Sequence, residues 1–392
     1  MKTIRELDIS GKRLLIRVDF NVPMDGAGNI TDDLRIRTVL PTIEYALEQN
    51  AQIILCSHMG RPKGQRMEKF SLRPVARYLS DILGKSVTLA PDCVGRETEA
   101  VVAAMHDGDV VLLENLRFHA AEQENDQDFA RQLAALADVY INNAFAVSHR
   151  AHASVVGVPQ FCSEKAAGFL LQKEMDYFHR SIDAPSRPLV AIVGGAKVSS
   201  KLGALENMLD KVDCMLIGGA MANTFLKSQG YDVGASKAED DLLEDARKLL
   251  HNASQKGVKV YLPVDVIAAE RFSADAVSKQ VTVQDIPENW MALDVGPATV
   301  ICFTEVLADA RTIIWNGPMG AFEMDAFARG TMALAHAVGA AHALSITGGG
   351  DSNAAVKKSG EADNISYMST GGGAFLMLME GKELPGVAAL DA

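Results

Sequence analysis

The sequence predicts an α/β protein made of two domains, each built around a parallel sheet. Apolar runs of strand length alternate with segments of helical periodicity along nearly the whole chain, which is typical of βαβ units. The chain has 392 residues, which is long for a single hydrophobic core. A single large sheet is the alternative that length alone leaves open.

In the first half, buried strands are expected over Leu14–Val18, Gln52–Cys56, Val110–Leu113 and Val139–Ile141. Helical periodicity between them predicts helices over Leu34–Glu48 and Leu72–Leu83.

The boundary between the domains is expected at residues 170–188. Apolar residues at 171, 175 and 178 have helical spacing, and a turn-rich link over 183–188 precedes the next strand. We therefore expect a first domain over 1–170, a helix and linker over 171–187, and a second domain over 188–379.

Four apolar runs of the second half end in glycine clusters followed by helix-like segments. They are LVAIVGGAK (189–197), CMLIGGA (214–220), ALSITGGGDS (343–352) and ISYMSTGGGA (365–374). Each predicts a strand, a turn that lets the backbone approach a ligand, and a helix N-terminus suited to phosphate. In open α/β sheets ligands bind at the carboxyl ends of the strands, so four such turns indicate a shared ligand edge.

Charged residues near these turns are candidates for phosphate and metal binding. If a helix begins at Ala196, Lys197 and Lys201 share one face and favour a polyphosphate between them. Asp351 follows three glycines, where its plain role is a helix N-cap beside Ser352; a carboxylate there can also hold Mg²⁺. Glu323 is placed to accept hydrogen bonds from ribose hydroxyls, or is merely exposed.

Polar and cationic residues, in place of glycines, follow the strands of the first half. They are Asp19, Asn21, His58, Arg61, Arg117, His149 and Arg150, with Arg35 and Arg37 at the start of the next helix. A single arginine is best interpreted as a solvated surface residue. The group as a whole predicts an anion site, because the planar guanidinium matches carboxylate and phosphate oxygens.

Composition excludes several classes of function. The net charge of −12 argues against nucleic acid or an anionic membrane as partner. No apolar run reaches the roughly 18 residues of a membrane span, and the first residues do not resemble a signal peptide. Five cysteines without a CxxC pair indicate neither a disulfide framework nor a zinc site, and predict reduced, mostly buried thiols in a cytoplasmic protein.

The motifs that the sequence lacks narrow the chemistry further. GxxxxGK[ST], GxGxxG, GxSxG and HExxH are all missing. An anion site on one domain and a phosphate-loop site on the other indicate phosphoryl transfer, which depends on positioning and charge neutralisation more than on a covalent nucleophile.

At this point the chain resembles a known family. RVDFNVP, SHMGRPKG, ENLRF, SHRAH, VAIVGGAKVSSK, WNGPMGAFE, GGGDS and STGGGAF, in this order, are similar to the motifs of phosphoglycerate kinases from end to end. The resemblance implies two Rossmann-like domains that are hinged across a central cleft. It implies reversible phosphoryl transfer from 1,3-bisphosphoglycerate to Mg-ADP, giving 3-phosphoglycerate and ATP. It also implies that the tail, about 380–392, packs on the first domain.

The resemblance also implies roles for individual residues. The phosphoglycerate is assigned to Asp19, Phe20, Asn21, Arg35, His58, Met59, Gly60, Arg61, Arg117 and Arg150. The transferred phosphoryl group is assigned to Arg35, Lys197, Gly372 and Gly373, with Gly371 in the same loop. The nucleotide is assigned to Lys201, Gly218, Gly219, Asn316, Pro318, Glu323, Gly349, Gly350, Asp351 and Ser352, with Asp351 toward Mg²⁺.

One segment departs from the family's DAFGTAHR pattern. Here it reads NAFAVSHR, with Asn143, Ala146, Val147 and Ser148 in place of Asp, Gly, Thr and Ala. We expect weaker orientation of Arg150 and altered hinge coupling, because a carboxylate and a hydroxyl are lost beside it.

Two rival functions are weighed against the kinase. A dehydrogenase is disfavoured by the missing dinucleotide fingerprint. A nucleotide-binding scaffold with weakened turnover is disfavoured by the intact Arg35, Lys197 and Asp351. We expect a cytoplasmic monomer that acts on small molecules.

Overall fold

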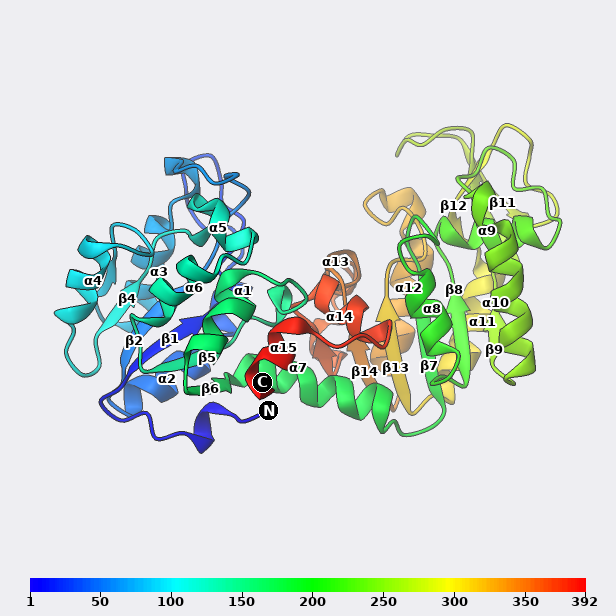
Figure 1. Ribbon diagram of the computed structural model, residues 1–392. Helices are drawn as coiled ribbons and strands as arrows, with labels where there is room; N and C mark the ends of the chain where they lie inside the picture. The colour runs from blue at the N-terminus through cyan, green and yellow to red at the C-terminus, as the bar shows by residue number, and fades with distance from the viewer. The chain divides into compact units, whose positions relative to one another are not determined.

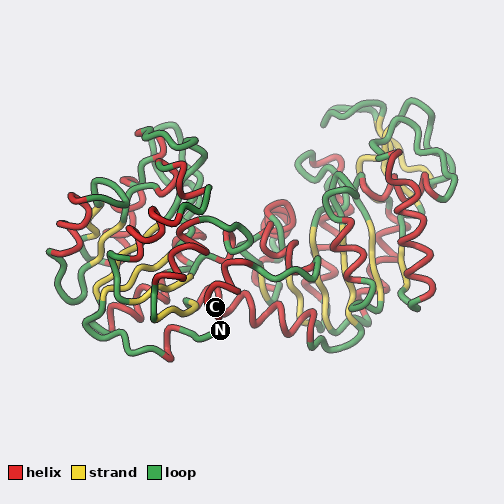
Figure 2. The backbone as a smooth tube through the Cα atoms, viewed as in Figure 1, coloured by secondary structure: helices red, strands yellow, loops and turns green.

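The computed structural model describes residues 1–392 and divides the chain into two compact units. Unit 1 comprises Met1–Met175 and Glu383–Ala392, and unit 2 comprises Asp176–Lys382. Helices lie alongside the strands of the main sheet in each unit (Figures 1 and 2). The architecture is α/β with two parallel six-stranded sheets, so the alternative of a single large sheet is wrong.

The sheet of unit 1 has the strand order β3-β4-β2-β1-β5-β6, with all neighbours parallel. Its strands are β1 (Arg13–Arg17), β2 (Gln52–Cys56), β3 (Val87–Leu89), β4 (Val110–Leu112), β5 (Val139–Asn142) and β6 (Glu164–Ala167). The central strands are almost wholly buried, which explains why they read as continuous apolar runs without alternation.

The helices of unit 1 are α1 (Leu34–Arg37), α2 (Leu40–Glu48), α3 (Arg73–Leu83), α4 (Arg96–Ala103), α5 (Ala120–Gln123), α6 (Gln127–Ala134), α7 (Phe169–Phe178) and α15 (Pro385–Asp391), with α7 crossing into unit 2. The single helix predicted over Leu34–Glu48 is wrong, since the chain breaks between α1 and α2. Pro41 explains the break, because proline has no N–H for the helix and its ring collides with a preceding carbonyl.

The sheet of unit 2 has the order β15-β14-β13-β7-β8-β9, again parallel throughout. Its strands are β7 (Leu189–Val193), β8 (Cys214–Ile217), β9 (Lys259–Tyr261), β13 (Thr312–Asn316), β14 (Leu344–Thr347) and β15 (Tyr367–Met368). A second sheet of three antiparallel strands, absent from the sequence prediction, contains β10 (Asp265–Ala269), β11 (Ser278–Thr282) and β12 (Met291–Val295).

The helices of unit 2 are α8 (Leu202–Met208), α9 (Met221–Ser228), α10 (Leu243–Gln255), α11 (Pro297–Ala308), α12 (Arg329–Ala340), α13 (Gly350–Ser359) and α14 (Gly372–Met379). Three of the four glycine clusters lead into a helix as predicted, namely those before α9, α13 and α14. These helix N-termini follow the carboxyl ends of strands β8, β14 and β15 in one sheet.

The C-terminal segment lies in unit 1, next to the start of the chain (Figure 1). The terminal ammonium group of Met1 is 2.8 Å from the carboxylate of Asp391. The Gly386 N–H donates to the Ser148 carbonyl at 2.8 Å, and the Gly386 carbonyl accepts from Asn142 Nδ2 at 3.1 Å. The tail is thus hydrogen-bonded to the segment that follows β5.

Candidate active site

In unit 1, the carboxyl ends of β1 and β2 bring Asp19, Asn21 and Gly60 together around Arg35. Arg35 Nη1 donates to Asp19 Oδ2 at 2.9 Å and to the Asn21 carbonyl at 3.0 Å. Asn21 Oδ1 accepts from the Gly60 N–H at 2.9 Å. Asp19 is buried at 6 % exposure, whereas the Arg35 side chain remains 39 % exposed. The buried carboxylate therefore orients a guanidinium whose other nitrogens stay free for a ligand.

Arg117 reaches the same residues from the short helix that follows β4. Its Nη1 donates to the Gly60 carbonyl at 2.8 Å. The residue is only 4 % exposed, and its Nε and Nη2 are buried without a hydrogen-bond partner. Burial, followed by the charges of Arg150 and Arg17, lowers the Arg117 pKa to about 10. Unpaired buried donors are costly, so this side chain is built to receive an anion.

The positive charges of this edge come from arginines alone, because the histidines among them are neutral at pH 7. Burial and the charge of Arg17 are the leading causes that hold the pKa of His58 well below its ordinary value. Burial and the charge of Arg117 lower the pKa of His152 to about 4. Neutral imidazoles can offer hydrogen bonds without adding to the repulsion between the arginines.

Sequence reasoning missed a buried polar network beneath this edge. Arg17, 1 % exposed, donates through Nε to Ser154 Oγ at 2.9 Å and lies 3.3 Å from His58 Nδ1. Ser154 in turn donates through its hydroxyl and its backbone N–H to the fully buried Glu122, at 2.6 and 2.9 Å. Arg17 was not predicted as a site residue because it lies inside an apolar strand. A charged residue within that buried strand was the one signal that it belongs to a polar network.

The other residues predicted for this site lie on the same edge with different exposure. Phe20 and Met59 are buried, and the Phe20 N–H donates to Ser57 Oγ at 2.8 Å. Arg150 donates through Nε to His149 Nε2 at 3.2 Å. Arg61 is exposed and makes no hydrogen bond or ion pair. The structure thus holds most of this set in place and leaves Arg61 in solvent.

The atypical segment after β5 is buried and largely hydrogen-bonded. Asn143 Oδ1 accepts from the Leu170 N–H at 2.9 Å, which satisfies a donor in the first turn of α7, while Asn143 Nδ2 is buried without a partner. The Ser148 hydroxyl donates to the Ala144 carbonyl at 3.1 Å. Val147 packs in a small apolar cluster. Asn143 therefore contacts the α7 N-terminus as a neutral side chain, without the negative charge that an aspartate would place there.

In unit 2, three turns pack against one another at the carboxyl ends of β7, β8 and β13. The Gly194 and Gly195 N–H groups donate to the Asn316 and Pro318 carbonyls, both at 3.0 Å. A Cβ on Gly194 would lie 2.1 Å from the Pro318 carbonyl oxygen, and one on Gly219 would lie 2.5 Å from Gly195 N. Glycine is required here because the backbones leave no room for a side chain.

Lys201 lies in the middle of these turns. Its Nζ donates to the Gly194 carbonyl at 2.6 Å and to the Asn316 carbonyl at 2.8 Å. Burial lowers its pKa to about 8, opposed by the charge of Asp351. Two of the three ammonium donors are used by the protein, which leaves one for a ligand.

The prediction that Lys197 and Lys201 share a helix face is wrong. Helix α8 begins only at Leu202, and residues 194–201 form a loop. Gly195 has a φ of +116°, which a helix cannot contain. Lys197 is exposed and unpaired in this loop, so the two ammonium groups are positioned by different parts of one turn.

Asp351 is not a helix cap, which corrects the plainer of its two predicted roles. Helix α13 begins at Gly350 with Gly349 at the N-cap, and Asp351 lies exposed in its first turn without a hydrogen bond. Ser352 is buried and accepts from the Gly317 N–H at 2.7 Å. A Cβ on Gly372, the first residue of α14, would be 3.3 Å from Gly349 Cα. Two helix N-termini therefore meet beside a free carboxylate.

A cavity of about 460 Å³ opens between these turns and the small antiparallel sheet. Among the predicted nucleotide residues, Gly219, Pro318, Glu323 and Asp351 line it. The others do not line it, namely Lys201, Gly218, Asn316, Gly349, Gly350 and Ser352. Lining residues that the sequence did not reveal are Lys237, Phe272, Met291, Ala292 and Leu293, supplied largely by β12 and the loop after β10. The cavity has a mainly apolar wall and a polar end, which suits a base joined to phosphates.

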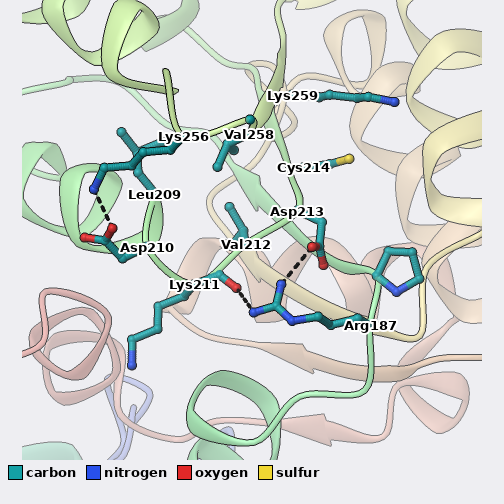
Figure 3. Close-up of a pocket in the computed structure, with 12 residues that line it drawn as sticks. Arg187, Leu209, Asp210, Lys211, Val212, Asp213, Cys214, Lys256, Val258 and Lys259 are labelled. Atoms are coloured by element: carbon teal, nitrogen blue, oxygen red, sulfur yellow. Dashed lines mark hydrogen bonds and ion pairs between the residues drawn. The ribbon is translucent and has the colours of Figure 1, made fainter. Parts of the chain in front are cut away.

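A larger depression, of about 780 Å³, lies at the amino ends of β7, β8 and β9 (Figure 3). Most of its charges, with the exception of Lys259, are engaged within the protein. Arg187 donates to Asp213 at 2.7 Å and to the Lys211 carbonyl at 2.9 Å, and Lys256 is paired with Asp210 (Figure 3). It is therefore a poorer candidate than the cavity at the opposite edge of the sheet.

One unit thus presents a cationic edge with unpaired donors, and the other presents a glycine-lined cavity with a free carboxylate. Together they define a phosphotransferase that handles two phosphorylated ligands. The sequence profile of phosphoglycerate kinase matches residues 4–382. The chain belongs to the phosphoglycerate kinase family.

Phosphoglycerate kinases of several organisms are similar to this chain over essentially its full length. The chain is 69 % identical over 392 residues to the phosphoglycerate kinase of Desulfotalea psychrophila, covering 100 % of both chains. It is 58 % identical to that of Citrifermentans bemidjiense, over 99 % of this chain and 98 % of the relative. The solved phosphoglycerate kinase of Coxiella burnetii matches with a TM-score of 0.91 at 44 % identity, over 99 % of this chain and 98 % of that one. None of the helices here combines the length and apolar character needed to cross a membrane.

Proposed function

We propose that the chain catalyses reversible transfer of the acyl phosphate of 1,3-bisphosphoglycerate to Mg-ADP, giving 3-phosphoglycerate and ATP, as a step of glycolysis and gluconeogenesis. The observation that carries the proposal is the pair of buried, unpartnered donors on Arg117, at the edge that also holds Arg35 and Asp19. A small molecule with a carboxylate and a phosphate has the oxygens needed to accept hydrogen bonds from these donors.

The phosphoglycerate binds to unit 1 in this proposal. Arg117 Nε and Nη2 and the guanidinium of Arg150 bind its oxygens, because arginine forms two parallel charge-assisted hydrogen bonds with such groups. His58 contributes a neutral hydrogen bond. Asp19 binds no anion itself; it orients Arg35 through the 2.9 Å ion pair.

The nucleotide binds to unit 2. The base occupies the 460 Å³ cavity, Glu323 accepts from the ribose hydroxyls, and Lys201 donates its remaining N–H to a phosphate oxygen. Asp351 fits a Mg²⁺ ligand, because its carboxylate is exposed, unpaired and beside the cavity. When bound, Mg²⁺ neutralises phosphate charge and orients the oxygens for transfer.

Transfer itself needs cations that strengthen their contacts as charge moves to the phosphoryl oxygens. Arg35 on unit 1 and Lys197 on unit 2 have free donors for this role, and the N–H groups of Gly372 and Gly373 add the partial positive charge of a helix N-terminus. Closure of the two units about the 170–188 segment and the 371–373 turn would join the sites and exclude water, which otherwise hydrolyses the acyl phosphate.

The protein is proposed to act as a cytoplasmic monomer. Its net charge of −12 supports the absence of nucleic acid or an anionic membrane as partner.

Replacement of Lys197 by alanine tests the assignment. We expect kcat to fall by at least 100-fold while the Kd for ADP changes less than about threefold, because the charge acts chiefly in the transition state. Lys259→Ala is the matched control, since Lys259 is an exposed lysine at the amino end of the same sheet. Loss of ADP affinity with kcat preserved would contradict the proposed role.

A further inference from the structure

A cluster of three metal-binding side chains lies in unit 1, outside both substrate sites. Asp92 and Cys93 follow strand β3, and His119 follows strand β4, its neighbour in the sheet. One ligand atom from each residue lies within 4.8 Å of the others. Cys93 and His119 are 26 positions apart in the sequence, which is why no cysteine motif indicated a zinc site.

The three side chains are already arranged around one point. His119 Nε2 is 2.8 Å from Asp92 Oδ1, and the Cys93 N–H donates to the same oxygen at 2.7 Å. Burial would raise the pKa of Asp92, but the hydrogen bonds from His119 and Cys93 outweigh it and lower that pKa. The carboxylate is therefore ionised. The His119 ring nitrogen lies beside it, and Cys93 contacts it through the backbone N–H, with the sulfur within 4.8 Å of the other ligand atoms.

The surroundings hold these ligands in place and leave an entry path. Thr98 Oγ1 donates to the Asp92 carbonyl at 3.0 Å, and the His119 ring packs against Phe129 with centroids 5.2 Å apart. Cys93 is fully buried behind the cluster, whereas the side chains of Asp92 and His119 are 37 % and 32 % exposed. Asp92 and His119 are thus the solvent-accessible members of the cluster, and an entering ion replaces the hydrogen bond between them.

We propose that Asp92, Cys93 and His119 form a binding site for one divalent ion of the zinc class, with water as the fourth ligand. Zinc accepts this mixture of sulfur, nitrogen and oxygen, whereas Mg²⁺ and Ca²⁺ require oxygen ligands. Ligand atoms of a tetrahedral zinc site are roughly 3.5 Å apart, so closing the longest separation needs a shift of about 1 Å.

Binding exchanges a proton for the metal. Burial raises the pKa of the Cys93 thiol, so the thiol is protonated in the metal-free protein and loses its proton to solvent as the sulfur–metal bond forms. His119 binds through the Nε2 lone pair and keeps a proton on Nδ1, and any proton on Nε2 that Nδ1 does not take up passes to solvent. No electron transfer occurs. At least one proton, that of the thiol, is therefore released for each ion bound at neutral pH. The bound ion would link the loops after β3 and β4.

Cobalt titration of the metal-free, nucleotide-free protein tests the site, because Co²⁺ replaces Zn²⁺ and a thiolate ligand gives it a near-ultraviolet charge-transfer band. We expect the band to saturate at one ion per chain, to be displaced by Zn²⁺ but not by Mg²⁺, and to disappear in Cys93→Ser. Cys214→Ser is the control, because Cys214 is a half-buried thiol of unit 2 outside any such cluster.

A second variant keeps the test decisive if Cys93→Ser does not fold. His119→Gln changes a partly exposed residue, and we expect it to weaken Co²⁺ binding at least tenfold and to leave the thermal unfolding curve of the metal-free protein nearly unchanged. The proposal is overturned by wild-type protein that shows no thiolate band, by a band that persists in Cys93→Ser, or by His119→Gln with unchanged affinity. Metal uptake without proton release would also overturn it.

Discussion

Arg117→Met should stabilise the free protein and weaken phosphoglycerate binding, a combination that distinguishes a binding residue from a structural one. The substitution removes Nε and Nη2, two buried nitrogens without partners, and one hydrogen bond to the Gly60 carbonyl. Methionine fills much of the same space, so the cavity term stays small.

The magnitude follows from these groups. Relieving two unpaired donors gains about 1–3 kcal/mol each, and losing one charged hydrogen bond costs about 1.5–3 kcal/mol. At the middle of each range the gain of about 4 kcal/mol exceeds the loss of about 2 kcal/mol, so we expect the free energy of unfolding to rise by about 2 kcal/mol. The KM for 3-phosphoglycerate should rise by about 10- to 150-fold for each charge-assisted hydrogen bond lost.

Urea denaturation with and without 3-phosphoglycerate, together with steady-state kinetics, measures both effects. Arg13→Met is the matched control, because Arg13 lies in the same sheet and its guanidinium is paired with Asp138 at 2.9 Å. That exposed pair should contribute under about 1 kcal/mol, and its loss should leave KM unchanged. A less stable Arg117→Met with an unaltered KM would refute the reasoning, since the donors would then have partners in the free protein.

Three further predictions concern the remaining features of the sites. The pKa of Lys201 is lowered to about 8, and bound phosphate favours the charged form of the side chain. The affinity for Mg-ADP should therefore fall by up to about tenfold per pH unit above pH 8. Calorimetry at several pH values measures this dependence, which should be absent in Lys201→Met. Asp351→Asn should raise the Mg²⁺ concentration needed for half-maximal activity by at least tenfold, while the Kd for metal-free ADP stays within about threefold of the wild-type value. An unchanged Mg²⁺ requirement would exclude Asp351 as a ligand. Val147→Thr combined with Ser148→Ala should alter the KM for 3-phosphoglycerate, and steady-state kinetics identical to wild type would show that the atypical segment is benign.

The sequence predicted the features of the fold that depend on long apolar runs. Strands β1, β2, β4 and β5 could be placed because parallel strands are buried on both faces and read as continuous apolar segments. The antiparallel sheet of β10–β12 could not, because β11 is mostly exposed and its residues lack a clear pattern. Met291, Ala292 and Leu293 of β12 line the cavity, so this part of its wall could not be predicted from the sequence.

Site residues were predictable where a turn needs glycine or where charge follows a strand. Gly194 and Gly219 fall in the first group, and Arg117 falls in the second. The loop over 194–201 was not predictable, because its path is fixed by hydrogen bonds to the distant Asn316 and Pro318 carbonyls. The cluster of Asp92, Cys93 and His119 depends in the same way on the pairing of β3 with β4.

The most direct test of the central claim is ADP formation from Mg-ATP, measured with and without 3-phosphoglycerate. A coupled dehydrogenase step should draw off the unstable acyl phosphate. We expect ADP to form only when 3-phosphoglycerate is present and its formation to collapse in Arg35→Ala, because Arg35 neutralises the phosphoryl group in transfer. Folded wild-type protein that binds ADP and 3-phosphoglycerate but forms no ADP, or that forms it equally fast without 3-phosphoglycerate, would contradict the account.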